Sequence, residues 1–432
     1  MSRTESESSD LPAGLANLPG NGRLILAFSG GADSTALASF VAAGRQGREA
    51  VCVHIDHGLD PGSGQRAEAA RSIAADLSLA FVLETAVISS PGNQEAAARH
   101  ARYCLLKKHV EEGDCLLTAH HADDQVETIF LRLMRGAGPR GLAGIPRLRR
   151  FGRGWLARPL LDWTRAALQD HCRRTGLAWA EDPSNHSLDA DRNFLRHQIL
   201  PALRQRWAGL DQSVLTSGRL ADQAARTIEA RVKPLMASAL QGCDRIDASR
   251  LQGLSDLELA EVIRMWARDR VGDAPPGKPL DEFLAQIGSA RRDQIPELRW
   301  KTARIRYWHK HFWLNSPEPF VPYALDWRTD HVLKLPNRLG SLQIAGAARA
   351  PSLKLRVRSG KAGERLKTAS NGSSYRVKEL LRTNAIAPWQ REQWPRICQD
   401  DRLLAVGDRW IDHAFADWLK NHQLELHWHT LN

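Results

Sequence analysis

Short apolar runs alternate with helix-length segments along the first 135 residues, and this alternation constrains the fold more than any other feature. The apolar runs that predict buried strands are residues 23–28, 49–55, 81–87 and 115–119. The segments that predict helices are residues 34–43, 65–77, 94–111 and 123–135. Helices of this length between strands imply right-handed crossovers that cover both faces of a sheet. The sequence therefore predicts an α/β domain built on a doubly wound parallel sheet.

The chain has 432 residues, which is enough for about three domains at roughly 150 residues each. We predict a polar N-terminal tail, the parallel-sheet domain, a mainly helical middle domain and a small α+β C-terminal domain. Their predicted ranges are residues 1–20, 21–216, 217–325 and 345–432. The first ten residues are acidic and polar and lack the apolar core of a secretory signal. All apolar runs fall far short of the ~20 residues of a membrane span, so we expect no membrane association.

The six cysteines are widely spaced, and no two of them form a CxxC pair. This spacing argues against a zinc ribbon or a cysteine-held iron–sulfur cluster, and the low cysteine content suits a reducing cytoplasm. Lys and Arg number 60 against 49 Asp and Glu, which gives a formal net charge of +11. A surplus of this size favours a polyanionic partner, with nucleic acid first, although a merely basic soluble protein would also show it.

The last region combines positive charge with tryptophan. Residues 352–382 contain nine Lys or Arg against two Glu, and eight of the 14 Trp lie beyond residue 300. Such a mixture suits a surface that contacts RNA backbone and stacks bases. The alternative is that most of these tryptophans belong to a hydrophobic core.

A glycine-bearing loop follows the first predicted strand and opens the first predicted helix. It consists of Ser29, Gly30, Gly31, Ala32, Asp33 and Ser34. Its glycines allow positive φ and close backbone approach, and the helix presents free N–H groups and the positive end of its dipole. These features predict a phosphate cradle, although a plain turn with a helix cap would also use them. The loop lacks the Lys of a Walker A loop, and Asp33 would need a bridging Mg²⁺ beside phosphate.

Two further polar clusters follow the second and fourth predicted strands. They comprise His54, Asp56 and His57, and then His120, His121, Asp123, Asp124 and Glu127. Because ligands of open parallel sheets bind at the carboxyl ends of strands, we expect both clusters to converge with the glycine loop. Asp123 and Glu127 lie one helical turn apart, as a shared magnesium site or an acid/base group requires, although acidic residues also favour helix N-termini. The histidines could equally make structural hydrogen bonds, and oxygen ligands beside a phosphate loop favour magnesium over zinc.

Several further motifs make the sequence resemble a known family. They are Ala101-Arg102-Tyr103, residues 135–138, 141–144, 158–161 and 182–185, and Arg192-Asn193-Phe194-Leu195-Arg196. With the loop and the two clusters, they resemble the tRNA(Ile)-lysidine synthase family of the N-type ATP pyrophosphatase (PP-loop) superfamily, whose ATP-binding domain is Rossmann-like. The resemblance is dense over the first ~210 residues and returns at residues 377–382 and 388–389. The middle region matches only in length and helical character.

The resemblance implies a cytoplasmic, AMP-forming ligase that uses ATP and Mg²⁺. ATP would adenylate O2 of the wobble cytidine in the CAU anticodon of tRNA(Ile), with release of pyrophosphate. The side-chain amine of free L-lysine would then attack C2 and expel AMP, and the resulting lysidine would switch codon specificity from AUG to AUA. The middle and C-terminal domains would bind the tRNA. The sequence leaves the oligomeric state open, a homodimer included.

The resemblance also implies roles for individual residues. The ATP-binding set would be Ser29, Gly30, Gly31, Ala32, Asp33, Ser34, His54 and His57. The catalytic set would be Asp33, Asp56, Arg102 and Glu127, and the magnesium ligands Asp33 and Asp123. The set that binds substrate or phosphate would be His120, Asp124, Arg192 and Arg196, although the two arginines could simply be exposed helix residues. The sequence leaves open which carboxylate, Asp56, Asp123, Asp124 or Glu127, takes the proton of the lysine amine.

The sequence departs from the family pattern at two positions. Asp60 stands where a basic residue is expected, and Ile145 stands where Met is expected. Three other classes of protein remain as alternatives: a tRNA thiolation enzyme on the same fold, a small-molecule amidating synthetase, and an RNA-binding protein with an inactive nucleotide fold. The absence of CxxC argues against the first, the basic Trp-rich tail against the second, and the intact loop with its carboxylates against the third.

Overall fold

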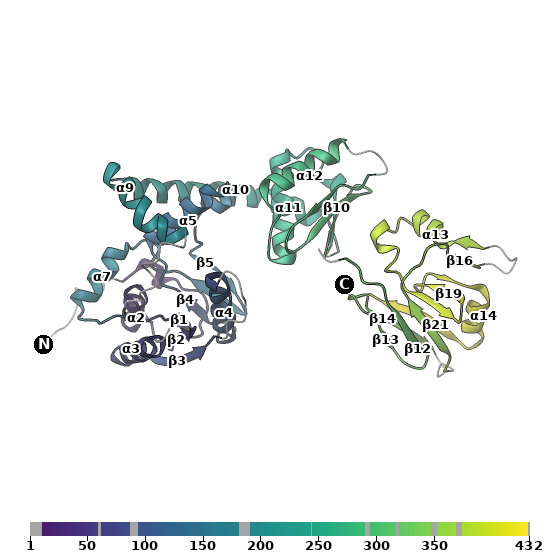
Figure 1. The fold of residues 1–432 in the computed structure, drawn as a ribbon, viewed down its shortest axis with the longest axis horizontal. Coiled ribbons are helices and arrows are strands. Elements are labelled where there is room, and N and C mark those ends of the chain that lie inside the picture. The colour runs from purple at the N-terminus through teal and green to yellow at the C-terminus, as the bar shows by residue number, and fades with distance from the viewer. Residues whose placement is uncertain are drawn as a thin grey trace. The chain divides into compact units, whose positions relative to one another are not determined.

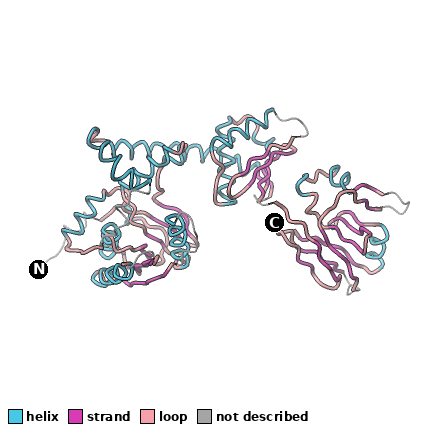
Figure 2. Tube along the Cα trace, viewed as in Figure 1, coloured by secondary structure: helices cyan, strands magenta, loops and turns pink. Residues whose placement is uncertain are grey.

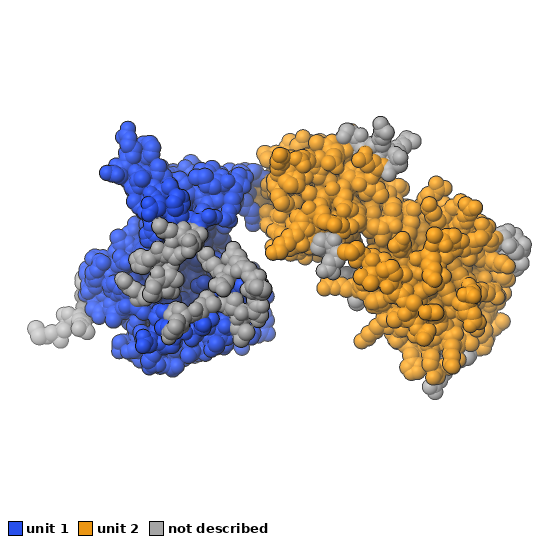
Figure 3. Space-filling view, in the orientation of Figure 1, with its two compact units in different colours: residues 1–228 blue, residues 229–432 orange. Residues whose placement is uncertain are grey.

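The computed structural model divides the chain into two compact units, Met1–Ile228 and Glu229–Asn432 (Figure 3). It describes residues 11–58, 62–86, 94–180, 191–242, 244–289, 294–316, 319–346, 352–368 and 374–430. Asp60 and the motif at residues 182–185 lie outside these ranges. Each unit is considered by itself below.

Unit 1 is built on a six-stranded sheet with the strand order β3-β2-β1-β4-β6-β5 (Figures 1 and 2). The strands are β1 (Leu24–Ala27), β2 (Ala50–Asp56), β3 (Ala80–Thr85), β4 (Cys115–Leu117), β5 (Leu148–Phe151) and β6 (Gly154–Ala157). All neighbouring pairs are parallel except β5 and β6, which form an antiparallel hairpin. The order reverses at β1, between β2 and β4, where doubly wound sheets bind ligands.

Alternate residues of the strands bury two separate cores, as expected when both faces of a sheet are covered. On one face Leu24 and Leu26 pack with apolar residues of three helices, whereas Ile25 faces the other core. These helices are α2 (Ala32–Gly44), α3 (Ser63–Asp76) and α7 (Arg165–Arg174). On the opposite face α4 (Gln94–Lys108) contributes Leu106. The doubly wound α/β prediction is confirmed.

The β5–β6 hairpin is the part of this sheet that the apolar pattern did not predict. β5 reads Leu-Arg-Arg-Phe, and its first three residues are exposed because it lies at the edge of the sheet. An edge strand needs no continuous apolar run, and charged side chains there discourage pairing with other chains. The sheet is therefore mixed rather than wholly parallel.

The short α1 (Ala13–Ala16) precedes β1, and the remaining helices of unit 1 come after β4 in the chain. α5 (Ala122–Met134) begins just after that strand, and α6 (Pro139–Leu142) follows. α8 (Asp191–Phe194), a π-helical turn (Leu195–Ile199) and α9 (Leu200–Arg206) lead into the long α10 (Leu210–Ala239). Val126 of α5 shares a small core with Leu195 and Leu200, which fixes this helical segment against α5.

The first part of unit 2 contains more strand than the mainly helical prediction. Its five-stranded sheet has the order β7-β8-β11-β10-β9, with α11 (Asp256–Val271) and α12 (Gly277–Ser289) as its helices. The strands are β7 (Leu240–Gln241), β8 (Arg245–Asp247), β9 (Glu297–Arg299), β10 (Arg304–Trp308) and β11 (His311–Asn315). Two of these strands, β10 and β11, form an antiparallel hairpin.

The last part of unit 2 is mainly antiparallel sheet. One sheet has the order β12-β15-β18-β19-β20, another β13-β14-β21, and β16 pairs with β17. The first sheet begins at β12 (Ala324–Arg328), which pairs along its whole length with β15 (Lys354–Arg358), so the sheet starts before residue 345. The other strands are β13 (Leu333–Lys334), β14 (Ser341–Gly346), β16 (Arg365–Leu366), β17 (Tyr375–Arg376), β18 (Arg396–Gln399), β19 (Arg402–Val406), β20 (Trp410–Ile411) and β21 (Leu424–His429). The α-helices of this part are α13 (Val377–Thr383) and α14 (His413–Asn421).

Within the described residues, no helix is both long enough and apolar enough to cross a membrane.

Asp114 joins three segments at the amino ends of β1 and β4. Its buried carboxylate accepts from the Arg23 amide at 2.7 Å, the Arg23 guanidinium at 2.8 Å and the Glu111 amide at 3.0 Å. Asp114→Ala should lower the free energy of unfolding by about 3 kcal/mol, because it leaves these donors without their acceptor. Urea denaturation measures the loss.

The control is Asp162→Ala, which breaks the exposed ion pair with Arg147. That change should cost about 1 kcal/mol or less. Equal losses for the two variants would contradict the role given to Asp114.

Candidate nucleotide-binding and catalytic site

The glycine loop occupies the turn from β1 to α2. Gly30 has φ +79°, and a Cβ on it would lie 3.1 Å from the Cβ of Ala70, so both conformation and space favour glycine there. The Ser29 hydroxyl lies 3.0 Å from the Ser34 hydroxyl and accepts from the Gly31 amide at 3.3 Å. The Ser34 hydroxyl also donates to the Gly31 carbonyl at 3.0 Å. These hydrogen bonds hold the loop at the N-terminus of a 13-residue helix, where backbone N–H groups and the helix dipole favour an anion.

The carboxyl end of β2 supplies the first polar cluster. The His54 ring is buried, and its Nδ1 lies 2.9 Å from the Phe28 carbonyl oxygen. Because a carbonyl only accepts hydrogen bonds, Nδ1 carries the hydrogen and Nε2 keeps its lone pair. Burial lowers the pKa of His54, and burial followed by the charge of Arg102 lowers the pKa of His57. Both rings are therefore neutral near pH 7. Asp56 accepts from the Gly58 amide at 2.8 Å and from the Ser63 hydroxyl at 3.3 Å, which shapes the loop after the strand.

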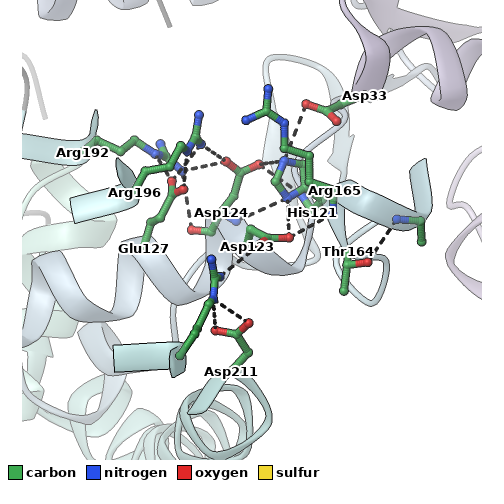
Figure 4. A network of polar contacts seen from close by, with 12 residues as sticks. Asp33, His121, Asp123, Asp124, Glu127, Thr164, Arg165, Arg192, Arg196 and Asp211 are labelled. Atoms are coloured by element: carbon green, nitrogen blue, oxygen red, sulfur yellow. Dashed lines mark hydrogen bonds and ion pairs between the residues drawn. The ribbon is translucent and has the colours of Figure 1, made fainter. Parts of the chain in front are cut away.

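The carboxyl end of β4 supplies two histidines in different electrostatic surroundings. The His120 Nδ1 lies 2.8 Å from the Thr118 hydroxyl, and burial lowers the pKa of His120 well below its usual range. His121 caps α5, and its Nε2 lies 3.5 Å from Asp33 and 3.6 Å from Asp124 (Figure 4). Burial opposes its positive charge, but the Asp33 and Asp124 carboxylates outweigh burial and raise the pKa of His121. The pKa of His121 is therefore shifted upward, whereas that of His120 is shifted downward.

Two arginines from the segment after α7 neutralise the buried Glu127. Arg192 Nε lies 2.6 Å from one Glu127 oxygen, and Arg196 Nε lies 2.6 Å from the other (Figure 4). The same arginines reach Asp124 at 3.0 and 3.4 Å. Burial raises the pKa of Asp124, but His121 and Arg192 exceed that effect, so the net shift is downward. Both carboxylates thus share the same two guanidinium groups.

Asp123 faces a different set of donors. One oxygen accepts from the Arg165 amide at 2.9 Å, and the other lies 3.1 Å from Arg204, which also pairs with Asp211 at 2.9 Å. Although Asp123 and Glu127 are one turn apart on α5, their carboxylates contact different arginines. In this arrangement they do not form one shared site.

Asp33 is the carboxylate that, within the described part of the chain, has an unpaired oxygen to offer a metal. Its Oδ1 is buried and has no hydrogen-bond partner among the residues that the structure describes. No group of three His, Cys, Asp or Glu side chains within the same residues is arranged to hold a metal. A Mg²⁺ bound through one or two carboxylates and substrate phosphates needs no such group, so the surroundings of Asp33 fit this ion.

The structure brings most of the predicted site residues together at one edge of the sheet. The loop, His54, His121, Glu127 and the Arg192–Arg196 pair occupy or adjoin the ends of β1, β2 and β4. Arg102 is exposed on α4 and close enough to act on His57. Ile145 contacts Gln125 through its backbone, with its amide donating at 2.6 Å and its carbonyl accepting at 2.8 Å, so the contact does not depend on the side chain at that position.

Two functional candidates were missed by the sequence reasoning. Arg204 reaches Asp123, and the buried Arg158 donates to the Pro146 carbonyl at 2.6 Å. Arg158 belongs to the family motif at residues 158–161. Its position directly after the strand β6 is the sequence signal that indicates a functional residue. Arg204 lies 81 residues from Asp123, and nothing local in the sequence indicates that contact.

His120 and His121 should contribute to the pH dependence of stability with opposite signs. Because the folded-state pKa of His120 lies below 6.5, its contribution is lost as pH falls below 6.5. Because the folded-state pKa of His121 lies above 6.5, its contribution is complete below 6.5 and is lost as pH rises through the folded-state value. Each can change the slope by up to about 1.4 kcal/mol per pH unit.

Urea denaturation from pH 4.5 to 8.5 would measure both effects. His120→Asn should flatten the stability curve below pH 6.5, and His121→Asn should flatten it above. The same change of slope in both variants would contradict the assignment.

Comparison with known proteins agrees with this geometry. Three family models match: a PP-loop domain over residues 6–203, a TilS substrate binding domain over residues 246–313 and a TilS substrate C-terminal domain over residues 355–428. The tRNA(Ile)-lysidine synthase of Alkalilimnicola ehrlichii is 36% identical over 399 residues, which cover 89% of this chain and 88% of that protein. The synthase of Xanthomonas campestris pv. campestris is 32% identical over 417 residues, which cover 94% and 95%. The chain therefore belongs to the tRNA(Ile)-lysidine synthase family.

Proposed function

We propose that this chain is an AMP-forming RNA ligase that joins free L-lysine to the wobble cytidine of tRNA(Ile) with a CAU anticodon. The observation that carries the proposal is that Asp33 of the intact PP-loop lies beside His121, which adjoins the Glu127 cluster. The relatives match this chain along almost its whole length. The PP-loop domain uses ATP. The product lysidine pairs with A, so the tRNA would read AUA in place of AUG.

In the first step O2 of the cytidine attacks the α-phosphate of ATP, and pyrophosphate leaves. The loop from Ser29 to Ser34 would hold the leaving pyrophosphate through backbone N–H groups and two hydroxyls at the helix N-terminus. Asp33 would hold Mg²⁺, which supplies neutralisation of phosphate charge when bound. His54 and His57 are neutral, so they can contact the nucleotide as hydrogen-bond partners without fixed charge.

In the second step the lysine amine must lose a proton before it attacks C2 of the adenylated base, and AMP leaves. Glu127 is buried, and both of its oxygens accept from guanidinium groups, so they are occupied in this arrangement. Phosphate groups of bound substrate would compete for Arg192 and Arg196, because guanidinium groups pair well with phosphate. Their departure would free the Glu127 oxygens to contact the amine, and Asp56, at the end of β2, is the other candidate base.

The remaining partners follow from charge and domain content. The middle and C-terminal domains, predicted over residues 217–325 and 345–432, would bind the tRNA, and the basic segment 352–382 would contact its phosphates. The enzyme would work in the cytoplasm, where tRNA, ATP and lysine meet. A homodimer remains compatible with this reaction.

The cysteines do not favour a sulfur-transfer enzyme. Of those within the described residues, only Cys104 is exposed. Burial raises the pKa of Cys52 to about 12 and that of Cys115 to about 11, so neither forms a reactive thiolate at neutral pH.

A direct assay tests the proposal. The protein is incubated with ATP, Mg²⁺, radiolabelled lysine and a CAU-anticodon tRNA(Ile) transcript, and RNA-bound lysine is measured beside AMP. We expect stoichiometric AMP and RNA-bound lysine, and their loss on chelation of divalent cations. Sulfur incorporation into RNA, or lysine transfer without AMP, would refute the proposed reaction.

Asp33→Ala should lower the rate of AMP formation by about 10² or more, because it removes a carboxylate placed to position metal and phosphate. Affinity for tRNA should change little, since the phosphate loop is not the surface that holds the RNA backbone. AMP is quantified by chromatography and tRNA binding by filter retention. Asp162→Ala, at an exposed carboxylate outside the site, is the control and should keep the normal rate; near-normal turnover in Asp33→Ala would place the metal or the phosphate elsewhere.

A further inference from the structure

The edge of the unit 1 sheet carries a cluster of positive charge that the reaction itself does not use. Arg149 and Arg150 of β5, Arg153 of the hairpin turn, and Lys107 and Lys108 at the end of α4 are all exposed; we call these five the hairpin cations. A Cβ on Gly152 would lie 3.2 Å from Lys107 Cγ, so the hairpin turn and the end of α4 are in contact. The five cations therefore form one patch.

The hairpin cations border the edge strand on both faces of the sheet. Arg149 pairs in register with Leu156 on the face covered by α4, and Arg150 pairs with Trp155 on the opposite face, because successive side chains of a strand alternate. Two of them lie over aromatic rings: Arg150 over Trp155 at 4.0 Å and Arg149 over Phe151 at 5.4 Å. Stacking on a ring holds the guanidinium plane in place and leaves its edges available for hydrogen bonds to an anion.

A line of cation–aromatic contacts links the patch to the candidate site. Arg149 lies over Phe151, Phe151 meets Tyr103 edge to face at 5.9 Å, and Arg99 lies over Tyr103 at 5.3 Å. Burial lowers the pKa of Arg158, and the charges of Arg149 and Arg99 lower it further, so all three arginines share one electrostatic neighbourhood. Positive potential therefore extends from the hairpin towards His120 and the strand ends.

Acidic neighbours do not cancel this charge. Glu111 and Glu112 are exposed in the turn before β4, which leaves the five cations in excess. Protection of an exposed edge strand explains one or two charged residues on β5. It does not explain why the charge continues through the turn to Lys107 and Lys108, nor why two arginines are held against rings.

We propose that the hairpin cations bind backbone phosphates of tRNA alongside the catalytic domain while the wobble cytidine enters the site. Cations spread along and across an exposed sheet edge can each meet a separate phosphate of an RNA strand, whereas a compact anion would contact only one or two of them. The proposal deepens the proposed function and rests on it for the identity of the RNA.

The test uses the full chain with three charges removed, Arg149→Gln/Arg150→Gln/Arg153→Gln. Filter binding to the CAU-anticodon tRNA(Ile) transcript is measured over a series of KCl concentrations. We expect Kd to rise about tenfold or more at low salt, and the slope of log K against log salt to fall by about 2 to 3. Binding of a non-hydrolysable ATP analogue should stay unchanged.

The matched control is Arg45→Gln/Arg173→Gln/Arg174→Gln, which removes equal charge at exposed positions of α2's end and α7. It should change Kd by less than about threefold, as expected for charge outside the contact surface. Wild-type Kd and salt slope in the hairpin variant would overturn the proposal, as would equal losses in the control. If the hairpin variant aggregates but binds tRNA with normal affinity, the charges serve only to keep the edge strand from pairing with other chains. That result would also overturn the proposal.

Two further measurements keep the outcomes separate. If the triple variant does not fold, Lys108→Gln/Arg153→Gln alters two exposed side chains and should still lower the salt slope by about 1 to 2. Lysine transfer by the wild-type protein is assayed in parallel, and its absence would refute the proposed function. If the wild-type protein transfers lysine and the hairpin variants bind tRNA with unaltered affinity, only the role of the hairpin cations in RNA binding is refuted.

Discussion

The parallel pairing of β1 with both β2 and β4 is the constraint on which the site depends. Ala27 pairs with Val53, and Leu26 pairs with Leu117, so all three strands end at the same edge of the sheet. The residues that follow them are the glycine loop, His54 and Thr118. Because the sheet interior is buried on both faces, a shift of this register would expose core residues, and the hydrophobic cores therefore fix the relative positions of the polar clusters.

At this edge the problem for the fold is an excess of negative charge. Asp33, Asp123, Asp124 and Glu127 lie close together; Arg192, Arg196 and Arg204 pair with three of them, and His121 lies beside Asp33 and Asp124. Removal of one cation would leave buried carboxylates without counter-charge, which is costly. The same balance suits a nucleotide site: guanidinium groups that pair with carboxylates in the absence of substrate can pair with phosphate in its presence. Under the proposed function, stability and substrate binding would therefore use the same side chains.

The tryptophans and the basic residues have different roles in this chain. Trp327 is buried, and its indole N–H donates to the His331 carbonyl at 2.8 Å, so it stabilises the C-terminal domain from within. Trp155 and Trp389 each lie beneath an arginine, at 4.0 and 4.7 Å. Aromatic side chains here mainly build cores and support guanidinium groups, and the arginines and lysines provide the surface charge that suits RNA.

The sequence by itself determined the strand–loop–helix order of the PP-loop domain, the identity of the loop and the convergence of its polar clusters. These depend on local patterns: apolar period, glycine position and the rule that strand ends gather ligands. Only the tertiary structure decided the partners of the carboxylates, since Arg196 reaches Glu127 across 69 residues and Arg204 reaches Asp123 across 81. It also decided that Asp123 and Glu127 serve separate ion pairs and that an arginine-rich hairpin closes the sheet, because an exposed edge strand carries no apolar signal and long-range charge pairing leaves no trace in local sequence.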